Sequence, residues 1–447
     1  MMKKYVVSKW YIFIQIALSL FVTFGARFAY AEINGQVEAY GLSFISPDFE
    51  NSKKEFGFFG ASLMSQNADK DTFKINLRGE YAIGSPVLST LNVREMYFTY
   101  FIDEDSTIHI GRRKQNWSDV DERWNLGFFQ PEFRANPLNS ETQGQTGIFY
   151  ENKKGSWKFT FFGSPVFIPD QGPNFEIKDG QFVASNPYFA PPPQNIYFQS
   201  VLLPIDYNIQ KPEVAEVIFQ TSYGLQIYYG EKKGVYSQVS SMYKPSNQLA
   251  YGWKGVLVTD RVRVDVKPKT YYEKIFNWDI GYKDDWGDVG LSVMYVDAEN
   301  PDFESNYNHP IYSQNVTFGP HLTYRWNPFS FEVAGLFNQN GQVTESGPNS
   351  EQFKRSLSQM FLYQNAYYAQ VSYKTLLSSN LKYKTSFQWL EAEKNLYKTV
   401  KWRNYLDIKG PWKFILDLLL VETSDEISNV SSYRNLDQVW LGVIYVF

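Results

Sequence analysis

The stretch Leu381-Lys382-Tyr383-Lys384-Thr385-Ser386-Phe387-Gln388-Trp389 places apolar or ring-bearing side chains at every second position. Residues two apart share one face of a β-strand, so the stretch predicts a strand with one apolar face and one polar, basic face. The same period recurs at 73–81, at 261–267 and at 412–420, where Trp412 and Phe414 oppose Lys413 and Asp417. Gly, Pro, Asn and Asp interrupt the pattern at intervals, which predicts an all-β chain.

The composition fits a sheet that contacts lipid on one face. Of the 447 residues 18% are aromatic, with 33 Tyr, 36 Phe and 12 Trp, and the rings stand near strand ends, as at a membrane interface. Short turns alternate with longer polar loops, the rhythm of an up-and-down barrel. We therefore expect a transmembrane antiparallel β-barrel of about 18–20 strands; 20 is the first estimate and 18 the alternative, because 248–275 is hard to divide.

The first 31 residues have the pattern of a secretory signal peptide. Lys3, Lys4 and Lys9 precede an apolar run over 11–24, and Ala29-Tyr30-Ala31 is a small-x-small cleavage site. We expect residues 1–31 to be removed and 32–447 to form the barrel. A permanent N-terminal anchor helix is the alternative. Removal takes four basic residues and no acidic one, so the formal charge goes from -4 to -8.

Several protein classes are excluded. The chain has no Cys, so disulfides, thiolate metal sites and Cys nucleophiles are absent. No apolar run of about 18 residues follows the leader, which argues against a helical membrane protein. The acidic balance gives no reason to expect a nucleic-acid partner.

The chain ends in Gly442-Val443-Ile444-Tyr445-Val446-Phe447. This end resembles the closing-strand signal of outer-membrane barrel proteins, which has a terminal aromatic residue, apolar or aromatic residues at alternate positions before it and a Gly further up. The resemblance implies that Gly442, Tyr445 and Phe447 are read by the barrel assembly machinery. It also implies export to the outer membrane of a Gram-negative bacterium, with outer-membrane lipid around the barrel. The last strand would pair with the first, so that no open edge remains in lipid.

The polar faces of the cleanest strands are predicted to face the lumen, and they carry ten basic residues against the four acids Glu80, Asp265, Asp407 and Asp417. A basic pore attracts anions, and the alternative is a neutral network of cross-strand pairs. The ten predicted lumen residues are Lys74, Arg78, Arg261, Arg263, Lys267, Lys382, Lys384, Lys401, Arg403 and Lys413.

Two segments, 117–146 and 165–212, are too long to be turns. The first contains Trp117 and Trp124, and the second holds nine of the 21 prolines, among them Pro191, Pro192 and Pro193. Stiff, ring-rich loops are predicted to fold inward as constrictions; the alternative is an external cap.

Val93-Arg94-Glu95-Met96-Tyr97, followed by Gly111-Arg112-Arg113, Trp117 and Asn136-Pro137, resembles a signature of large outer-membrane porins and alginate-export-type channels. In that signature a strand reading L-R-E-A-Y leads to G-R-Q, W-G and N-P. Here Arg113 replaces the Gln, and Ser118 replaces the Gly after the Trp. The match covers about fifty residues, and it implies a diffusion or export channel for charged substrates.

Catalytic motifs are absent. The chain contains no G-x-S-x-G and no H-E-x-x-H, and its three histidines, His109, His309 and His321, are far apart. His109 is expected to be a polar lining residue. The acidic run Asp119-Val120-Asp121-Glu122 lacks the Gly and distal Glu of a calcium loop, so we expect a solvated loop and no metal. We expect no cofactor and no enzyme activity.

The sequence therefore predicts an outer-membrane channel, of porin or polysaccharide-export type, for polar and anionic solutes or a polymer. A periplasmic export partner would accompany polymer export. Two other classes stay open: a structural or adhesive protein anchored by its barrel, and a barrel-embedded enzyme in which His109 or His321 approaches a Ser and an acid.

Overall fold

The computed structural model describes residues 33–45, 55–65, 73–183, 186–189, 191–347, 365–392, 397–423 and 436–447. The predicted leader, 1–31, lies outside the described residues. In the part of the chain that the model describes, no helix is long and apolar enough to cross a membrane.

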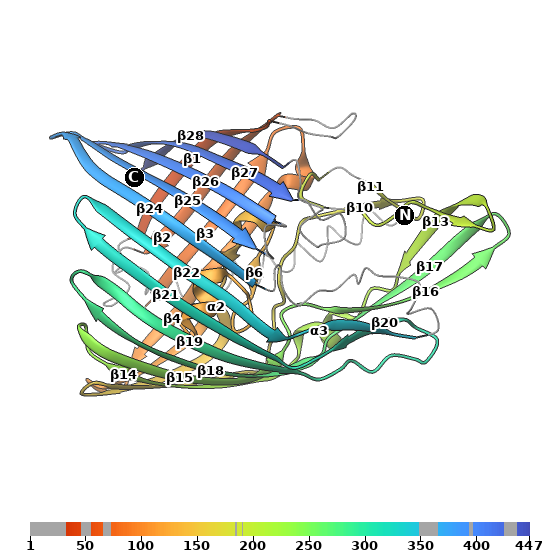
Figure 1. Ribbon diagram of the computed structural model, residues 1–447, viewed down its shortest axis with the longest axis horizontal. Coiled ribbons are helices and arrows are strands. Elements are labelled where there is room, and N and C mark those ends of the chain that lie inside the picture. Colours follow the sequence, from red (N-terminus) through yellow and green to blue (C-terminus); the bar gives the residue numbers. More distant parts are fainter. Residues whose placement is uncertain are drawn as a thin grey trace, which may run out of the picture.

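Eighteen strands form one closed antiparallel sheet, a β-barrel whose tilted strands run along the long axis of Figure 1. Each strand pairs with the next one of the set, and the last pairs with the first. The strands of the barrel are β1 (Ile33–Phe44), β2 (Glu55–Ser65), β3 (Phe73–Ala82), β4 (Thr90–Phe101), β5 (Ser106–Arg113), β8 (Gln145–Lys154), β9 (Trp157–Ser164), β14 (Ser222–Gly230), β15 (Gly234–Pro245), β18 (Tyr272–Asp284), β19 (Gly287–Ala298), β21 (Asn315–Trp326), β22 (Phe329–Asn340), β24 (Asn365–Ser378), β25 (Leu381–Ala392), β26 (Tyr397–Ile408), β27 (Trp412–Thr423) and β28 (Gln438–Val446).

The all-β, up-and-down prediction is confirmed, and of the two strand numbers 18 is correct. The segment 248–275 explains the miscount. It holds β16 (Ala250–Val258) and β17 (Arg261–Lys269), which lie outside the barrel in a four-stranded sheet with β12 (Asn195–Phe198) and β13 (Val201–Ile209). We call this sheet the outer sheet; it extends beyond the right-hand end of the barrel in Figure 1. Its strands alternate like barrel strands, so periodicity alone does not separate them.

The two ends of the barrel differ. Seven of the tight turns join neighbouring barrel strands at the left-hand end in Figure 1, for example β14 to β15 and β26 to β27. The long connections lie at the other end. They carry the outer sheet, the paired strands β10 (Glu176–Lys178) and β11 (Gln181–Val183), the pair β20 (His309–Tyr312) and β23 (Val343–Ser346), and the short helix α3 (Val214–Ile218). In bacterial barrels short turns face the periplasm, which orients the chain.

Alternation along each strand separates a lipid face from a lumen face. On β18 the outward Phe276 and Trp278 are 47% and 43% exposed, whereas the inward Asn277 and Asp279 are 0% and 1% exposed. Rings also gather where strands meet the short turns, as the aromatic girdle of a membrane barrel requires. The exposed rings near these turns are those of Trp157, Tyr229, Tyr282, Trp286, Tyr324, Trp326, Phe329, Trp412 and Phe447.

The barrel closes where β28 pairs with β1. Phe447 donates its N–H to the carbonyl of Gly35 at 2.9 Å, and Gly35 donates to the carbonyl of Phe447 at 3.0 Å. Further along the seam Gly442 faces Tyr40 in register. A Cβ atom at 442 would stand 2.8 Å from the Tyr40 Cβ atom, so a glycine is needed here to let the Tyr40 ring lie on the inner wall.

We expect Phe447→Ala to lower insertion of the barrel, because the residue both ends the predicted assembly signal and extends the closing seam. The measurement is the heat-modifiable migration and the surface level of the variant. Phe331→Ala, which removes a ring exposed on β22 away from the seam, is the matched control. Equal surface levels for both variants would contradict a special role for the C-terminal residue.

Candidate functional site

The connection between β5 and β8, residues 114–144, folds into the barrel and crosses its lumen; we call it the lumen loop. It contains α2 (Asp119–Trp124), β6 (Glu132–Phe133), the 3-10 turn η3 (Pro137–Asn139) and β7 (Glu141–Thr142). Within it Trp117 is 1% exposed and Phe129 is 0% exposed, and the two rings stack at 6.0 Å. Trp117 and Trp124, which the sequence analysis assigned to a constriction, are both buried in this loop, and their role in narrowing the passage stays a prediction.

One side of the lumen loop contacts the inner wall that runs from β18 through β19, β21 and β22 to β24. Ser118 caps α2 by accepting a hydrogen bond from the Asp121 N–H, and its own hydroxyl donates to Asn277 on β18 at 2.9 Å. Arg123 forms an ion pair with Glu332 on β22. Trp124 packs edge-on against the ring of Tyr368 on β24, with centroids 5.0 Å apart.

Asp121 belongs to the frame of this loop. Its carboxylate accepts the backbone N–H groups of Phe128 and Phe129 at 3.0 Å and 2.9 Å, and the side chain is 7% exposed. The prediction of a solvated acidic loop at 119–122 is therefore wrong, because these residues start a helix inside the lumen instead of a loop in solvent. Among the described residues no cluster of three or more acids and histidines has the geometry of a metal site.

The other side of the lumen loop binds the opposite wall. Lys401 on β26 donates to the carbonyl of Leu138 at 2.9 Å, and Arg403 donates to the Asn139 side chain at 2.5 Å. Glu141 receives two hydrogen bonds from Arg94 on β4, at 2.8 Å and 2.7 Å. The loop is thus fixed at both walls, and it narrows the lumen.

Most of the motif that resembles porins and export channels has a common task here, which is to hold the lumen loop. Arg94 binds Glu141, and Glu95 accepts the backbone N–H of Lys114 at 3.1 Å. Arg112 donates to the Gln143 side chain at 2.6 Å and to the Gly144 carbonyl at 3.0 Å. These residues hold the lumen loop in position, since each one is hydrogen-bonded to the loop itself.

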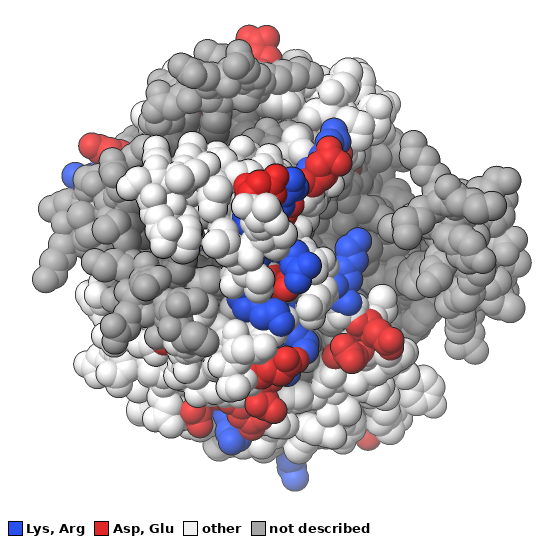
Figure 2. Space-filling view, turned by 90° about the vertical axis from the view of Figure 1, so that its right-hand side faces the viewer, with Lys and Arg blue, Asp and Glu red and all other residues white. Residues whose placement is uncertain are grey.

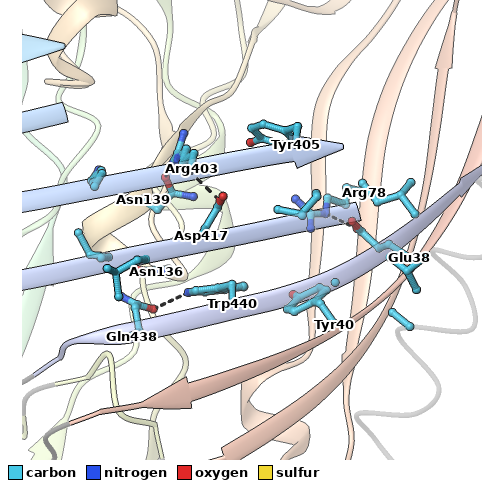
Figure 3. A pocket seen from close by; sticks show the side chains of 18 of the residues that line it. Glu38, Tyr40, Arg78, Asn136, Asn139, Arg403, Tyr405, Asp417, Gln438 and Trp440 are labelled. Atoms are coloured by element: carbon cyan, nitrogen blue, oxygen red, sulfur yellow. Dashed lines mark hydrogen bonds and ion pairs between the residues drawn. The ribbon is translucent and has the colours of Figure 1, made fainter. Parts of the chain in front are cut away.

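A cavity of about 320 Å³ lies between η3 and the wall built by β26, β27, β28 and β1. A smaller cavity of about 100 Å³ adjoins it on the side of η2 (Pro86–Leu88) and shares Tyr40, Arg78, Asn139 and Trp440 with it. We call the two together the constriction cavity. Figure 3 shows its polar and aromatic lining, in which Arg403 and Asp417 face Asn136 and Asn139.

Most charges that line the constriction cavity are paired, and the exception is Lys401, which donates to the Leu138 carbonyl and has no ion pair among the described residues. Arg78 contacts Glu38 at 2.7 Å and Glu80 at 2.6 Å, and Arg403 lies 3.7 Å from Asp417. Outside the cavity, Lys74 pairs with Glu95 at 3.0 Å. The alternative interpretation from the sequence, a network of cross-strand pairs, therefore describes this level of the lumen.

Three of the ten predicted lumen residues do not belong to the barrel wall. Arg261, Arg263 and Lys267 lie on β17 in the outer sheet, where they contact Asp206, Asp265 and Glu304. Placing them in the barrel lumen was wrong, because β17 alternates like a barrel strand but pairs parallel with β13. The other seven lie on the inner faces of β3, β25, β26 and β27.

Pro191, Pro192 and Pro193 were also misplaced by the sequence. They precede β12, and the Tyr207 hydroxyl of β13 donates to the Pro193 carbonyl at 2.7 Å. The prolines thus support the outer sheet and do not narrow the barrel lumen. An earlier part of the same connection does cover the mouth, since Asn174 donates to the Val87 carbonyl and Tyr188 donates to Gln438 on β28.

The lumen is less basic than the sequence suggested. The expectation of ten bases to four acids was wrong because it left out acids on strands without clean alternation and on the lumen loop. These acids include Glu38, Glu95, Asp119, Glu141, Asp279 and Glu332. Figure 2 looks onto the end with the long loops and shows acidic and basic side chains intermixed there.

One group of bases toward the short-turn end is in no ion pair, although Asp407 lies in register with both Lys382 and Lys413. Lys382 and Lys384 on β25 stand on the face opposite to Phe387, which is 49% exposed on the lipid side. Lys374 pairs in register with Lys384, and Lys413 faces Asp407 across the strands. Within the described chain none of these four lysines is in an ion pair, so we call them the exit lysines. They lie on β24, β25 and β27, the strands around β26, which carries Arg403, and they are nearer than Arg403 to the short turns.

The three histidines lie on three different strands, His109 on β5, His309 on β20 and His321 on β21. His109 lies on the inner wall, 3.0 Å from the Thr99 hydroxyl and 3.4 Å from Glu151. Among the described residues no serine hydroxyl is hydrogen-bonded to His109 or His321. The arrangement gives no support for the barrel-embedded enzyme.

No family model and no curated protein sequence matches this chain. Solved structures share its fold weakly. Pseudomonas aeruginosa OccK5 (OpdH) aligns over 93% of this chain and 98% of that chain, with 10% identity and a TM-score of 0.46. Pseudomonas aeruginosa OpdL aligns over 94% of this chain and 99% of that chain, with 10% identity and a TM-score of 0.47. OmpT, an outer membrane protein of Vibrio cholerae, aligns over 93% of this chain and 97% of that chain, with 9% identity and a TM-score of 0.40. None of the three is described as an alginate exporter, and at this identity no function transfers.

Deletion of α2 from the lumen loop should raise single-channel conductance, because α2 occupies the lumen between β18 and β24. The matched control is a deletion of similar length at the tip of the outer sheet, residues 196–201, which we expect to leave conductance unchanged. Equal effects of the two deletions would show that the lumen loop is not the narrowest point.

The docking of the lumen loop should weaken as the pH rises. Burial raises the pKa of Glu132 from 4.5 to about 8, and the group accepts a hydrogen bond from the Thr142 hydroxyl at 2.7 Å. The docked state holds a proton that the released loop loses, so docking is favoured below about pH 4.5 and loses stability between there and about pH 8.

The measurement is limited proteolysis of the folded protein at pH 5 and pH 8. We expect faster cleavage within 125–143 at pH 8, and a smaller difference in Glu132→Gln, which keeps the shape and cannot ionise. A variant with the same pH difference as the wild-type protein would rule out Glu132 as the cause.

Proposed function

We propose that the protein is an outer-membrane channel for polar solutes and that it prefers anions. The observation that carries the proposal is a narrowed polar passage in a closed barrel. The lumen loop leaves the constriction cavity beside the wall of β26 to β1, and the four exit lysines stand on the inner faces of β24, β25 and β27. The exit lysines are exposed or half-buried instead of buried against other side chains, which fits a water-filled passage better than a plugged anchor.

The anion preference is assigned to the exit lysines and not to the constriction. At the constriction Arg78 and Arg403 are paired with acids, so their fields are largely cancelled, and Lys401 there is held by the Leu138 carbonyl. The exit lysines have no acid within ion-pair distance among the described residues, and fixed positive charges in a narrow, partly desolvated passage attract counter-ions. The mouth in Figure 2 and the outer sheet both carry mixed charges, so neither of them would select ions by charge before the exit lysines are reached.

Export of an anionic polysaccharide would use the same passage and would need a periplasmic partner to drive it. The adhesive alternative is favoured by a different observation. The outer sheet exposes apolar side chains at its tips, with Tyr197 at 74% and Val201 at 57% exposure, and such patches bind other surfaces. Conductance of the purified protein in a planar bilayer separates the classes, since an anchor with a plugged lumen carries no current.

Replacing Lys374, Lys382, Lys384 and Lys413 together by Gln should abolish the anion preference, because it removes the unpaired charges and leaves the constriction intact. Reversal potentials in a salt gradient measure the preference, and the wild-type difference should shrink as the ionic strength rises. The control replaces Arg261, Arg263 and Lys267 by Gln, a similar loss of positive charge outside the barrel. A cation-selective wild-type pore, or an equal loss of selectivity in the control, would refute the assignment.

A further inference from the structure

Three aromatic side chains lie together on the inner wall of the constriction cavity, which we call the ring platform. The rings of Tyr40 and Phe58 are 4.7 Å apart with an angle of 13° between their planes, and those of Tyr40 and Trp440 are 5.2 Å apart at 29°. They come from β1, β2 and β28, across the closing seam. Tyr40 and Trp440 line both parts of the cavity, so a solute that passes the constriction moves along them.

We propose that the ring platform is a subsite for the pyranose ring of a neutral saccharide, which rests on the channel function proposed above. The apolar face of a pyranose presents C–H groups with partial positive charge, and the face of an aromatic ring carries partial negative charge. Stacking of the two leaves the hydroxyl groups at the rim of the sugar free for polar side chains.

The rim of the platform supplies such polar atoms without partners. Among the described residues Gln438 Nε2 and Asp417 Oδ1 are buried and have no hydrogen-bond partner, and the Tyr40 hydroxyl lies close to Glu80. Buried polar atoms of this kind are uncommon, because each one has lost its water without a replacement. All three residues line the cavity of about 320 Å³, which lies near the lower end of the usual range for small-molecule pockets, about 300–1,000 Å³.

The orientation of Gln438 is fixed by its neighbours. Its Oε1 atom accepts hydrogen bonds from the Trp440 indole N–H at 2.9 Å and from the Tyr188 hydroxyl at 2.8 Å. Two donors on one atom identify that atom as the oxygen, which leaves the amide nitrogen as a donor. Figure 3 shows Gln438 and Trp440 joined in this way on β28. The same contact holds the indole in place, so that the platform is formed before a ligand arrives.

A neutral polyol fits this set of groups better than an anion does. A hydroxyl both donates and accepts, so it can satisfy the amide donor of Gln438 and the carboxylate acceptor of Asp417 alike. An anion beside Asp417 and Glu38 would be repelled. Of the bases that line the cavity, Arg78 and Arg403 are already engaged by these acids at 2.7 Å and 3.7 Å, and Lys401 donates to the Leu138 carbonyl. The exit lysines and the ring platform therefore act on different properties of a solute.

The experiment measures block of the ion current by maltose, cellobiose and glucose in planar bilayers, together with calorimetric binding of the same sugars to the detergent-solubilised barrel. We expect concentration-dependent block by the wild-type protein. Trp440→Ala should raise the half-blocking concentration about tenfold or more, because one stacking face is lost. Trp440→Phe, which keeps a ring, should lie between the two. The matched control is Trp402→Ala, which removes an indole from the lipid side and should leave block unchanged.

The outcomes separate this inference from the channel function. Calorimetric binding that Trp440→Ala weakens supports the subsite even if the barrel carries no current. Absence of sugar binding in both measurements overturns the subsite, whatever the conductance. Equal effects of Trp440→Ala and Trp402→Ala overturn it as well, and so does block by benzoate but by none of the sugars. Replacing the four exit lysines by Gln should leave sugar binding as it is, and a matching loss there would also count against the ring platform.

Discussion

Closure of the sheet between β28 and β1 is the constraint on which the rest of the structure depends. Hydrocarbon offers no hydrogen bonds, so every backbone group at membrane depth needs a partner in the protein, and only a closed barrel pairs both edges of a sheet. The seam also shapes the lumen. Gly442 has no side chain, which leaves room for the Tyr40 side chain opposite to it. The ring of Trp440 on the last strand stacks on the ring of Tyr40 on the first.

Closure creates an interior that one loop then divides. The lumen loop stays inside because its own polar groups find partners on both walls: Ser118 and Arg123 on one side, Asn139 and Glu141 on the other. A loop without these contacts would leave buried polar groups unsatisfied and would return to water. Between the loop and the wall of β26 to β1 a cavity stays open, and the ring platform and the paired charges lie there.

Much of the fold could be predicted from the sequence, because a barrel strand needs only a period of two and a turn. The alternation at 381–389 marks β25 and its lumen face, and the rings at Trp412 and Phe447 mark the membrane interface. The motif around Arg94 and Arg112 can also be recognised in the sequence, but its task of holding the lumen loop cannot. For the candidate site, the sequence predicted Arg78, Lys401 and Arg403 as lining residues and missed Tyr40, Gln438 and Trp440.

The sequence by itself determined the all-β class, the lipid and lumen faces of regular strands, and the inward fold expected of the loop with Trp117. Only the tertiary structure decided which alternating strands belong to the barrel, since β17 follows the same period as β25 but pairs in the outer sheet. It also decided which charges are neutralised. Arg78 and Lys384 look equivalent in a strand pattern, yet a partner 40 residues away, Glu38, pairs with the first, while the second has none among the described residues. Local periodicity carries no information on such distant partners, because they meet only when β1 and β3 have both paired with β2.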